Sequence, residues 1–198
     1  MMSALEKAIA DISPDFAGPV KSDSRIFEKL LQHEATAEAI KVFAQEARKL
    51  SNYGYWFGLS ALWVSYSGWS DLELWKRLMS SPRPNRQTSM MKPSELRAFL
   101  RLPERIKAYR AHRPAEIDWI SYALDPLQAA LFARRRGVDR IAEYTIERAA
   151  ALCLSLRRGE TELLVLDKNA AKLVRWIDVV VAAQDDGGVE DCHGQRGE

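Results

Sequence analysis

The residues WISYALDPLQAALFARRRG, 119–137, set the architecture of the second half of this 198-residue chain. Residues 119–124 are mostly apolar and aromatic, which predicts a strand. Asp125, with a proline directly after it, combines a helix N-cap residue with the residue favoured at the first helical position. The helix is expected to end at Gly137, because arginines fill its last turn and glycine readily adopts the left-handed conformation beyond it. The segment therefore predicts a strand that leads directly into a helix.

Runs of apolar and β-branched residues on both sides of this segment predict further strands. The stretch from residue 185 onward is polar and glycine-rich, so we expect a disordered tail at 185–198. Residues 105–184 are therefore expected to form an α+β core. The further strands are expected at 106–112, 141–146, 162–166 and 172–181, with a short helical or irregular link at 147–154.

The first part of the chain, residues 1–81, is expected to be helical. Apolar residues recur at helical spacing from residue 24 to about residue 80. An aromatic stripe in this pattern is typical of a helix core, although it could also stack on bases or on a nicotinamide ring. Asp71 is expected to cap a helix that stops at the prolines after residue 81. The tryptophans of the stripe are Trp56, Trp63 and Trp75.

Composition excludes several classes of protein. Hydrophobic residues make up 47% of the chain, with only 10 Gly and 8 Pro, which excludes a low-complexity or wholly disordered chain. The two cysteines, Cys153 and Cys192, cannot form a disulfide scaffold and lack metal-finger spacing. We therefore expect a reducing, cytoplasmic setting and no metal site. The net charge of +2 gives no global attraction to nucleic acid.

Residues 50–70 contain no charged side chain and have the length of a membrane span. Asn52, five serines and three glycines make this stretch a poor match to hydrocarbon. We therefore expect a buried, aromatic-rich helix and no membrane association. Residues 1–10 carry Glu6 and Lys7, so they are not expected to be a signal peptide.

Positive charge gathers in residues 82–113, of which 82–104 are expected to form a basic loop and a short helix. This basic zone contains only Glu95 and Glu104 as acidic residues. It could be a solvated surface, or it could bind an anion such as a nucleotide diphosphate or a nucleic-acid backbone. Its nine cations are Arg83, Arg86, Lys92, Arg97, Arg101, Arg105, Lys107, Arg110 and Arg113.

Two glutamates stand at the start of a predicted strand, Glu160 and Glu162. Alternate residues of a strand point to the same face, so these side chains are expected about 7 Å apart. One interpretation is an exposed strand end beside Arg157 and Arg158. The other interpretation is that the two glutamates belong to an active site, and it rests on the order of motifs along the chain.

Three motifs follow one another in the second half: Tyr109-Arg110-Ala111 on a strand, Ser121 on a strand that feeds a helix, and Glu160-Thr161-Glu162 at a late strand. This order resembles the ADP-ribosyltransferase superfamily. It is most similar to small bacterial and phage-type members, whose pattern runs Tyr-Arg-Gly, Ser-Trp-Thr-Leu-Asp before an Ala-x-x-Phe-Ala helix, and Arg-Gly-Glu-x-Glu. The resemblance covers residues 105–167. It implies a small, mostly antiparallel split β-sheet core, with the helical N-terminal part packed beside it.

The resemblance also implies a reaction, in which NAD is the substrate and ADP-ribose passes to a protein or nucleic-acid acceptor. Breaking the nicotinamide–ribose bond develops oxocarbenium character on the ribose, as in glycoside hydrolysis. Glu162 would stabilise that charge and hydrogen-bond a ribose hydroxyl. Glu160 would activate or orient the acceptor, and Ser121 would brace the site. In this family, Glu-x-Glu often accompanies arginine acceptors.

Further residues are implied in binding NAD. Arg110, next to Tyr109, would hold a phosphate or the adjoining ribose with guanidinium geometry that lysine cannot reproduce. Tyr122 or Trp119 could stack on the nicotinamide, or either could belong to the core.

Two positions depart from the family pattern. Ala111 stands where the group has Gly, and Tyr122-Ala123 replaces Trp-Thr, which removes a hydroxyl next to Ser121. These departures keep a second hypothesis open: a non-catalytic protein of the same fold that binds a protein or nucleic acid through residues 82–113. A third hypothesis is NAD hydrolysis at the same site, with water as the acceptor.

Overall fold

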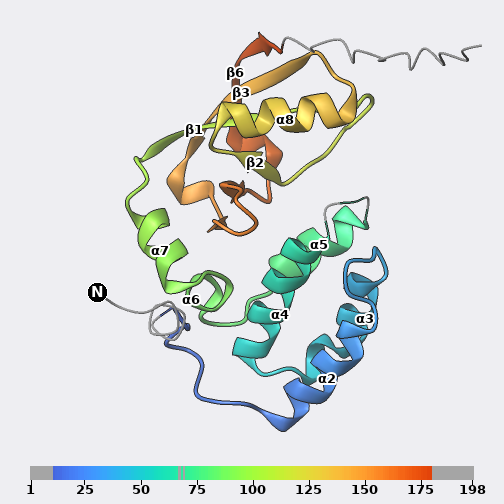
Figure 1. The fold of residues 1–198 in the computed structure, drawn as a ribbon. Helices are drawn as coiled ribbons and strands as arrows, with labels where there is room; N and C mark the ends of the chain where they lie inside the picture. The colour runs from blue at the N-terminus through green and yellow to red at the C-terminus, as the bar shows by residue number, and fades with distance from the viewer. Residues whose placement is uncertain (1–10, 67, 69, 180–198) are drawn as a thin grey trace, which may run out of the picture.

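The computed structural model describes residues 11–66, 68 and 70–179. Within them the chain is α+β, as the sequence predicts (Figure 1). The expected tail at 185–198 lies outside the described residues. The helices are α2 (Lys21–Leu31), α3 (Ala39–Glu46), α4 (Asn52–Ser65), α5 (Leu72–Met79), α6 (Arg86–Met90), α7 (Pro93–Leu100) and α8 (Pro126–Arg136). The strands are β1 (Arg105–Arg110), β2 (Ser121–Ala123), β3 (Arg140–Glu147), β4 (Cys153–Ser155), β5 (Glu162–Leu164) and β6 (Ala171–Asp178).

All six strands pair antiparallel in one sheet of order β4-β5-β2-β1-β3-β6. β1 pairs with β3 along the whole length of β1, whereas β1 and β2 share one registered pair, Tyr109 opposite Ala123. The resemblance implied a split sheet. In the structure the two three-stranded halves remain hydrogen-bonded, and they meet at this narrow waist.

The helical part and the sheet share one hydrophobic core. Phe43 and Trp56 from the helices are fully buried in the same cluster as Tyr122 and Leu163 from the strands. Burial of this apolar surface is the main force that holds the two parts together. In Figure 1, α2 to α5 lie below the sheet, and α6 and α7 connect the two parts along one side. The candidate site lies between these two parts.

A second, smaller cluster holds α8 on the sheet. Its buried members are all small or aliphatic, which lets the helix backbone lie close to the strands. The helix begins and ends where the sequence predicts. Asp125 accepts a hydrogen bond from the Leu127 N–H at 2.9 Å, and Gly137 follows the helix in the left-handed conformation with φ +65°. The buried residues of the cluster are Ala111, Ala123, Ala129, Ala133 and Ile141.

Short elements are where the sequence prediction was incomplete. Residues 82–104, where a loop and one short helix were expected, form two helices, α6 and α7. The five-residue α6 was missed because prolines and polar residues surround it. β4 lies in the expected link at 147–154 and pairs with β5. Three residues are too few to show a strand period, so tertiary pairing decides their structure.

The uncharged stretch at 50–70 is largely α4, which begins at an N-cap serine, Ser51. Its apolar side chains Trp56, Leu59 and Leu62 are buried in the core. Across the described residues, no helix combines the length and the apolar character needed to cross a membrane.

Candidate active site

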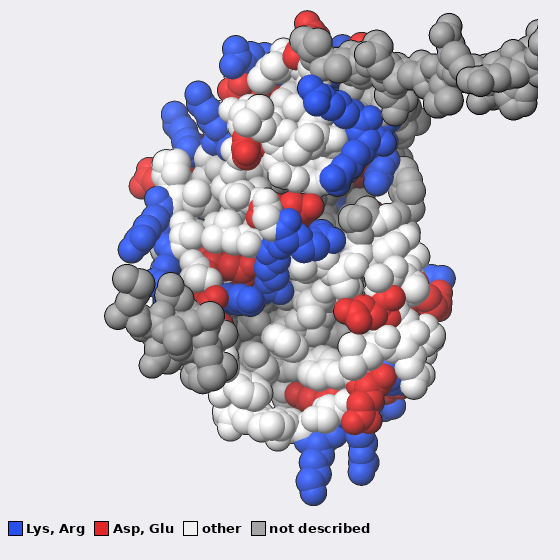
Figure 2. Space-filling model, viewed as in Figure 1, with Lys and Arg blue, Asp and Glu red and all other residues white. Residues whose placement is uncertain are grey.

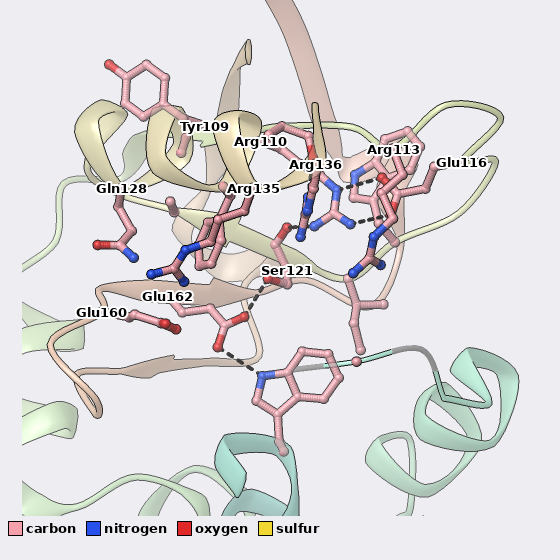
Figure 3. A pocket seen from close by; sticks show the side chains of 18 of the residues that line it. Tyr109, Arg110, Arg113, Glu116, Ser121, Gln128, Arg135, Arg136, Glu160 and Glu162 are labelled. Atoms are coloured by element: carbon pink, nitrogen blue, oxygen red, sulfur yellow. Dashed lines mark hydrogen bonds and ion pairs between the residues drawn. The ribbon is translucent and has the colours of Figure 1, made fainter. Parts of the chain in front are cut away.

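A cavity of about 340 Å³ opens where the waist of the sheet, α8 and the end of α4 meet. Its size lies in the range of small-molecule sites. Figure 2 shows Lys and Arg side chains gathered along the sheet side of this hollow, and Figure 3 shows the side chains that line it. The helical part contributes Trp63, Tyr66 and Trp75, and the other part contributes Arg110, Ser121, Glu160 and Glu162 among others.

Glu162 and Ser121 meet in this cavity. Glu162 begins β5 directly opposite Ala123 of β2, and Ser121 lies two residues earlier on β2. The Ser121 hydroxyl donates a hydrogen bond to Glu162 Oε1 at 2.5 Å, and the Trp63 indole N–H donates to Glu162 Oε2 at 2.9 Å (Figure 3). Each carboxylate oxygen therefore has one donor, and the two donors come from different parts of the chain.

The position of Glu162 inside the cavity disfavours the charged form of its carboxylate. Burial raises the pKa of Glu162 above its ordinary value, while the hydrogen bonds from Ser121 and Trp63 lower it. The charge of Glu160 raises the pKa further, and that of Arg158 lowers it. A carboxylate held in a cavity against its own desolvation is typical of catalytic acids and bases.

Arg110 reaches the same cavity, but its guanidinium is bound to protein groups. Its Nε and Nη2 donate to the two carboxylate oxygens of Glu116 at 3.1 and 2.6 Å, and its Nη1 donates to the Ser121 carbonyl at 2.6 Å. A guanidinium has five N–H donors, so two remain beyond these bonds. Arg110 therefore fixes the backbone of Ser121 and keeps limited capacity for a ligand.

Glu116 connects Arg110 to the interior of the sheet part. Burial alone would raise its pKa, but hydrogen bonds from His112 and Arg110 outweigh burial and lower the pKa to about 2. His112 in turn contacts the Tyr144 hydroxyl at 2.7 Å. Nothing in the sequence marked Glu116, because it lies in the loop between β1 and β2 and belongs to no motif.

Glu160 lies at the rim of the cavity, two residues before β5. The strand starts at Glu162, as the sequence predicts. Strand alternation therefore does not set the direction of the Glu160 side chain, which follows a turn at Arg158 and Gly159, both with positive φ. Glu160 and Glu162 nevertheless line the same cavity. Glu160 forms an ion pair with Arg158 at 3.5 Å.

Arg157, three residues before Glu160, has a structural role. It donates to both carboxylate oxygens of Glu95 at 3.1 and 3.0 Å and to the Met90 carbonyl at 3.0 Å. Glu95 is only 2% exposed, and this pairing compensates the cost of burying its polar atoms. Because Glu95 belongs to α7, this contact fixes the loop that contains Glu160 onto that helix.

Replacing Arg157 by Lys is expected to lower the free energy of unfolding by about 1.5 kcal/mol, because an ammonium cannot reproduce the two parallel bonds to Glu95. Urea unfolding followed by tryptophan fluorescence measures this loss. Arg158→Lys is the matched control, since Arg158 is exposed and should change stability by less than about 0.5 kcal/mol. Equal effects of the two substitutions would contradict the assigned role of Arg157.

Four further arginines line the cavity: Arg113, Arg135, Arg136 and Arg158. Arg136 donates to the Ala111 carbonyl, and burial together with repulsion from Arg110 and Arg113 lowers its pKa to about 10. It therefore stays charged at neutral pH. The sequence showed Arg135 and Arg136 only as cations in the last turn of a helix, and the fold directs them into the cavity (Figure 3).

The aromatic residues of the predicted site separate in the structure. Tyr109 and Trp119 line the cavity, and in Figure 3 the Tyr109 side chain points away from Glu162. Tyr122 is 1% exposed, accepts a hydrogen bond from the Trp119 indole at 2.8 Å and packs on Tyr144. The assignment of Tyr122 to NAD binding is therefore withdrawn, because this side chain points into the core.

The cations of the basic zone at 82–113 lie in different surroundings. Arg83 donates to the carbonyls of Leu50 and Ala47, and Arg86 donates to the Met79 carbonyl. These arginines stabilise the packing of the helical part. Arg110 and Arg113 face the cavity instead.

The described residues include no cluster of three His, Cys, Asp or Glu side chains with the arrangement of a metal site. Cys153 is buried, and burial raises the pKa of its thiol, so the reactive thiolate is disfavoured. Carboxylates, hydroxyl groups and guanidinium groups line the cavity. Comparison of the chain with protein-family models, with curated proteins and with solved structures found no match.

Proposed function

We propose that this protein is an NAD-dependent mono-ADP-ribosyltransferase, in which Glu162 stabilises the charge that develops on the ribose. The observation that supports this best is the convergence of Arg110, Ser121 and Glu162 in one cavity, as the resemblance requires. The three residues belong to separate strands, and hydrogen bonds connect them in series. If Glu162 only marked an exposed strand end, no such series of hydrogen bonds would be expected.

The reaction begins with cleavage of the bond between the nicotinamide nitrogen and the ribose C1′. The bonding electrons leave with nicotinamide, which departs as a neutral molecule, and positive charge develops on the ribose. The Glu162 carboxylate faces this charge and accepts a hydrogen bond from a ribose hydroxyl. The interaction is stronger in the transition state than in the ground state, which is the condition for catalysis.

In the second half of the reaction an acceptor X–H attacks C1′, and the X–C1′ bond forms. The proton of the acceptor passes to a base, for which Glu160 at the cavity rim is placed. Its side chain is 19% exposed, so a macromolecular acceptor can reach it from solvent. If water replaces the acceptor, the same steps produce free ADP-ribose.

The lining of the cavity suits NAD. The guanidinium groups of Arg135 and Arg136 match a diphosphate in charge and geometry. Phe132 and Trp119 offer apolar faces on which planar rings can stack. Because Arg110 is held by Glu116, we assign the diphosphate to Arg135 and Arg136 and the fixing of Ser121 to Arg110.

Replacing Arg135 by Gln is expected to raise KM for NAD about 10-fold and to change kcat by less than about two-fold, because one charged hydrogen bond to the diphosphate is lost. Steady-state assays of nicotinamide release measure both constants. Arg134→Gln is the control, since the neighbouring side chain on α8 does not line the cavity. An equal rise in KM for both substitutions would show that only general charge attraction is involved.

The test of the proposed function is incubation of the purified protein with NAD, alone and with cell lysate. Released nicotinamide together with a mass increment of ADP-ribose on a macromolecule supports the transferase. Nicotinamide release without any modified macromolecule indicates hydrolysis. No release under either condition would contradict the proposal and would favour a non-catalytic binding protein.

A further inference from the structure

Trp63 contacts the proposed catalytic carboxylate from the helical part of the molecule. It lies near the C-terminal end of α4, 99 residues before Glu162, and its indole N–H donates to Glu162 Oε2 at 2.9 Å. The other carboxylate oxygen is bound to Ser121. The plane of the carboxylate is therefore defined by one donor from the sheet and one donor from the helices (Figure 3).

The direction of the Trp63 N–H is itself fixed by packing. The Trp63 ring meets the Trp75 ring edge to face, with centroids 5.1 Å apart and planes at 89°. Trp75 is 4% exposed and donates its own indole N–H to the Ser70 hydroxyl at 2.9 Å. The aromatic stripe that the sequence showed as a core feature thus ends in an oriented donor inside the cavity.

We propose that Trp63 is a positioning residue for the transferase reaction: it holds the Glu162 carboxylate toward the ribose, so that the helical part completes the active site. This inference rests on the proposed function and adds a role for the N-terminal helices. Loss of orientation at a reacting group strongly reduces a rate even when substrate still binds. An N–H donor to a carboxylate also favours its charged form, which is the form the reaction needs.

The electrostatic surroundings of Glu162 define what a substitution will change. The groups that act on it are Glu160 and Arg158 from the preceding turn, Ser121 from β2 and Trp63 from α4. The Cys153 thiol on β4 also interacts with the charge of Glu162. It is neutral, because burial raises its pKa. Removing the Trp63 donor leaves the repulsion from Glu160 and the burial in place, so Glu162 should bind a proton at higher pH.

The test compares Trp63→Phe with Trp56→Phe. Trp56 lies on the same helix and is fully buried. Its indole N–H donates to the Pro84 carbonyl at 2.9 Å and not to Glu162. Trp63→Phe is expected to lower kcat about 10- to 100-fold, with KM for NAD within about two-fold, and to shift the acidic limb of the pH–rate profile to higher pH. Trp56→Phe should reduce thermal stability and leave kcat and the pH profile unchanged.

A second measurement does not depend on turnover. In protein labelled with 15N, the indole signal that is missing from Trp63→Phe is assigned to Trp63. It should shift as Glu162 titrates, and this titration should be absent from Glu162→Gln. An indole signal that does not follow Glu162, or an unchanged or increased kcat in Trp63→Phe, would overturn the inference while the transferase assignment stands. A wild-type protein that releases no nicotinamide would instead contradict the proposed function itself.

Discussion

Glu162→Gln is expected to lower the rate of nicotinamide release from NAD about 1,000-fold. The amide keeps the shape of the side chain, can still accept from Trp63 and can donate to the Ser121 oxygen, but it carries no charge to stabilise the ribose. Chromatographic quantification of nicotinamide over time measures the loss. Glu147→Gln is the matched control, because Glu147 pairs with Arg105 at the surface, where the side chains are 57% and 80% exposed.

The same substitution should make the folded protein more stable at neutral pH. The pKa of Glu162 is raised in the folded state, so the folded protein binds more protons than the unfolded chain above the ordinary value of 4.5. The contribution of Glu162 to stability is therefore lost as pH rises from 4.5 through its raised pKa in the folded state. An amide does not ionise, so the variant does not lose this contribution. Differential scanning calorimetry at pH 7 should show a higher Tm for Glu162→Gln than for wild type. A variant that is both inactive and unfolded would not support a catalytic role.

Glu116→Gln is expected to lower the free energy of unfolding by about 3 kcal/mol at neutral pH. The side chains of Arg110 and Glu116 are only 10% and 5% exposed, so removing one charge leaves the other buried without its partner. Urea unfolding measures the loss. Because the pKa of Glu116 is lowered to about 2, its contribution is present above the ordinary value of 4.5 and is lost as pH falls toward 2.

A double substitution separates this pair from the rest of the loop. Arg110→Met combined with Glu116→Leu removes both charges and keeps their approximate volume, so part of the lost stability should return. Wild type and Glu116→Gln should also converge in stability as pH approaches 2. Two results would show that Arg110 and Glu116 do not act as a buried ion pair. One is a difference in stability between wild type and Glu116→Gln that stays constant with pH. The other is a loss of stability in the double variant that exceeds the sum of the losses in the two single variants.

Local signals in the sequence predicted the elements that position the site. An apolar and aromatic run, an N-cap residue followed by proline, and a closing glycine are sufficient to define β2 and α8. The resemblance implied that Ser121 and Glu162 lie together, and in the structure they stand on adjacent strands and are joined by a hydrogen bond. The bounds of β2 and α8 depend on a few neighbouring residues, so a single sequence reveals them.

The contacts that complete the site join residues far apart in the chain. Trp63 lies in a stripe whose spacing is that of an ordinary core helix, and only the packing of α4 against the sheet brings its N–H to Glu162. Glu116 lies in an irregular loop with no periodic signal. Tyr122 was misassigned because a three-residue strand does not show which of its faces is buried. Tertiary packing decides each of these three cases.

The most direct test of the account is a crystal structure of Glu162→Gln with NAD bound, since this variant should bind NAD without consuming it. We expect the nicotinamide ribose within hydrogen-bond distance of the carboxamide at position 162, and the diphosphate against Arg135 and Arg136. NAD bound at another place on the protein, or a cavity that stays empty at saturating NAD while wild type shows no binding by calorimetry, would contradict the account.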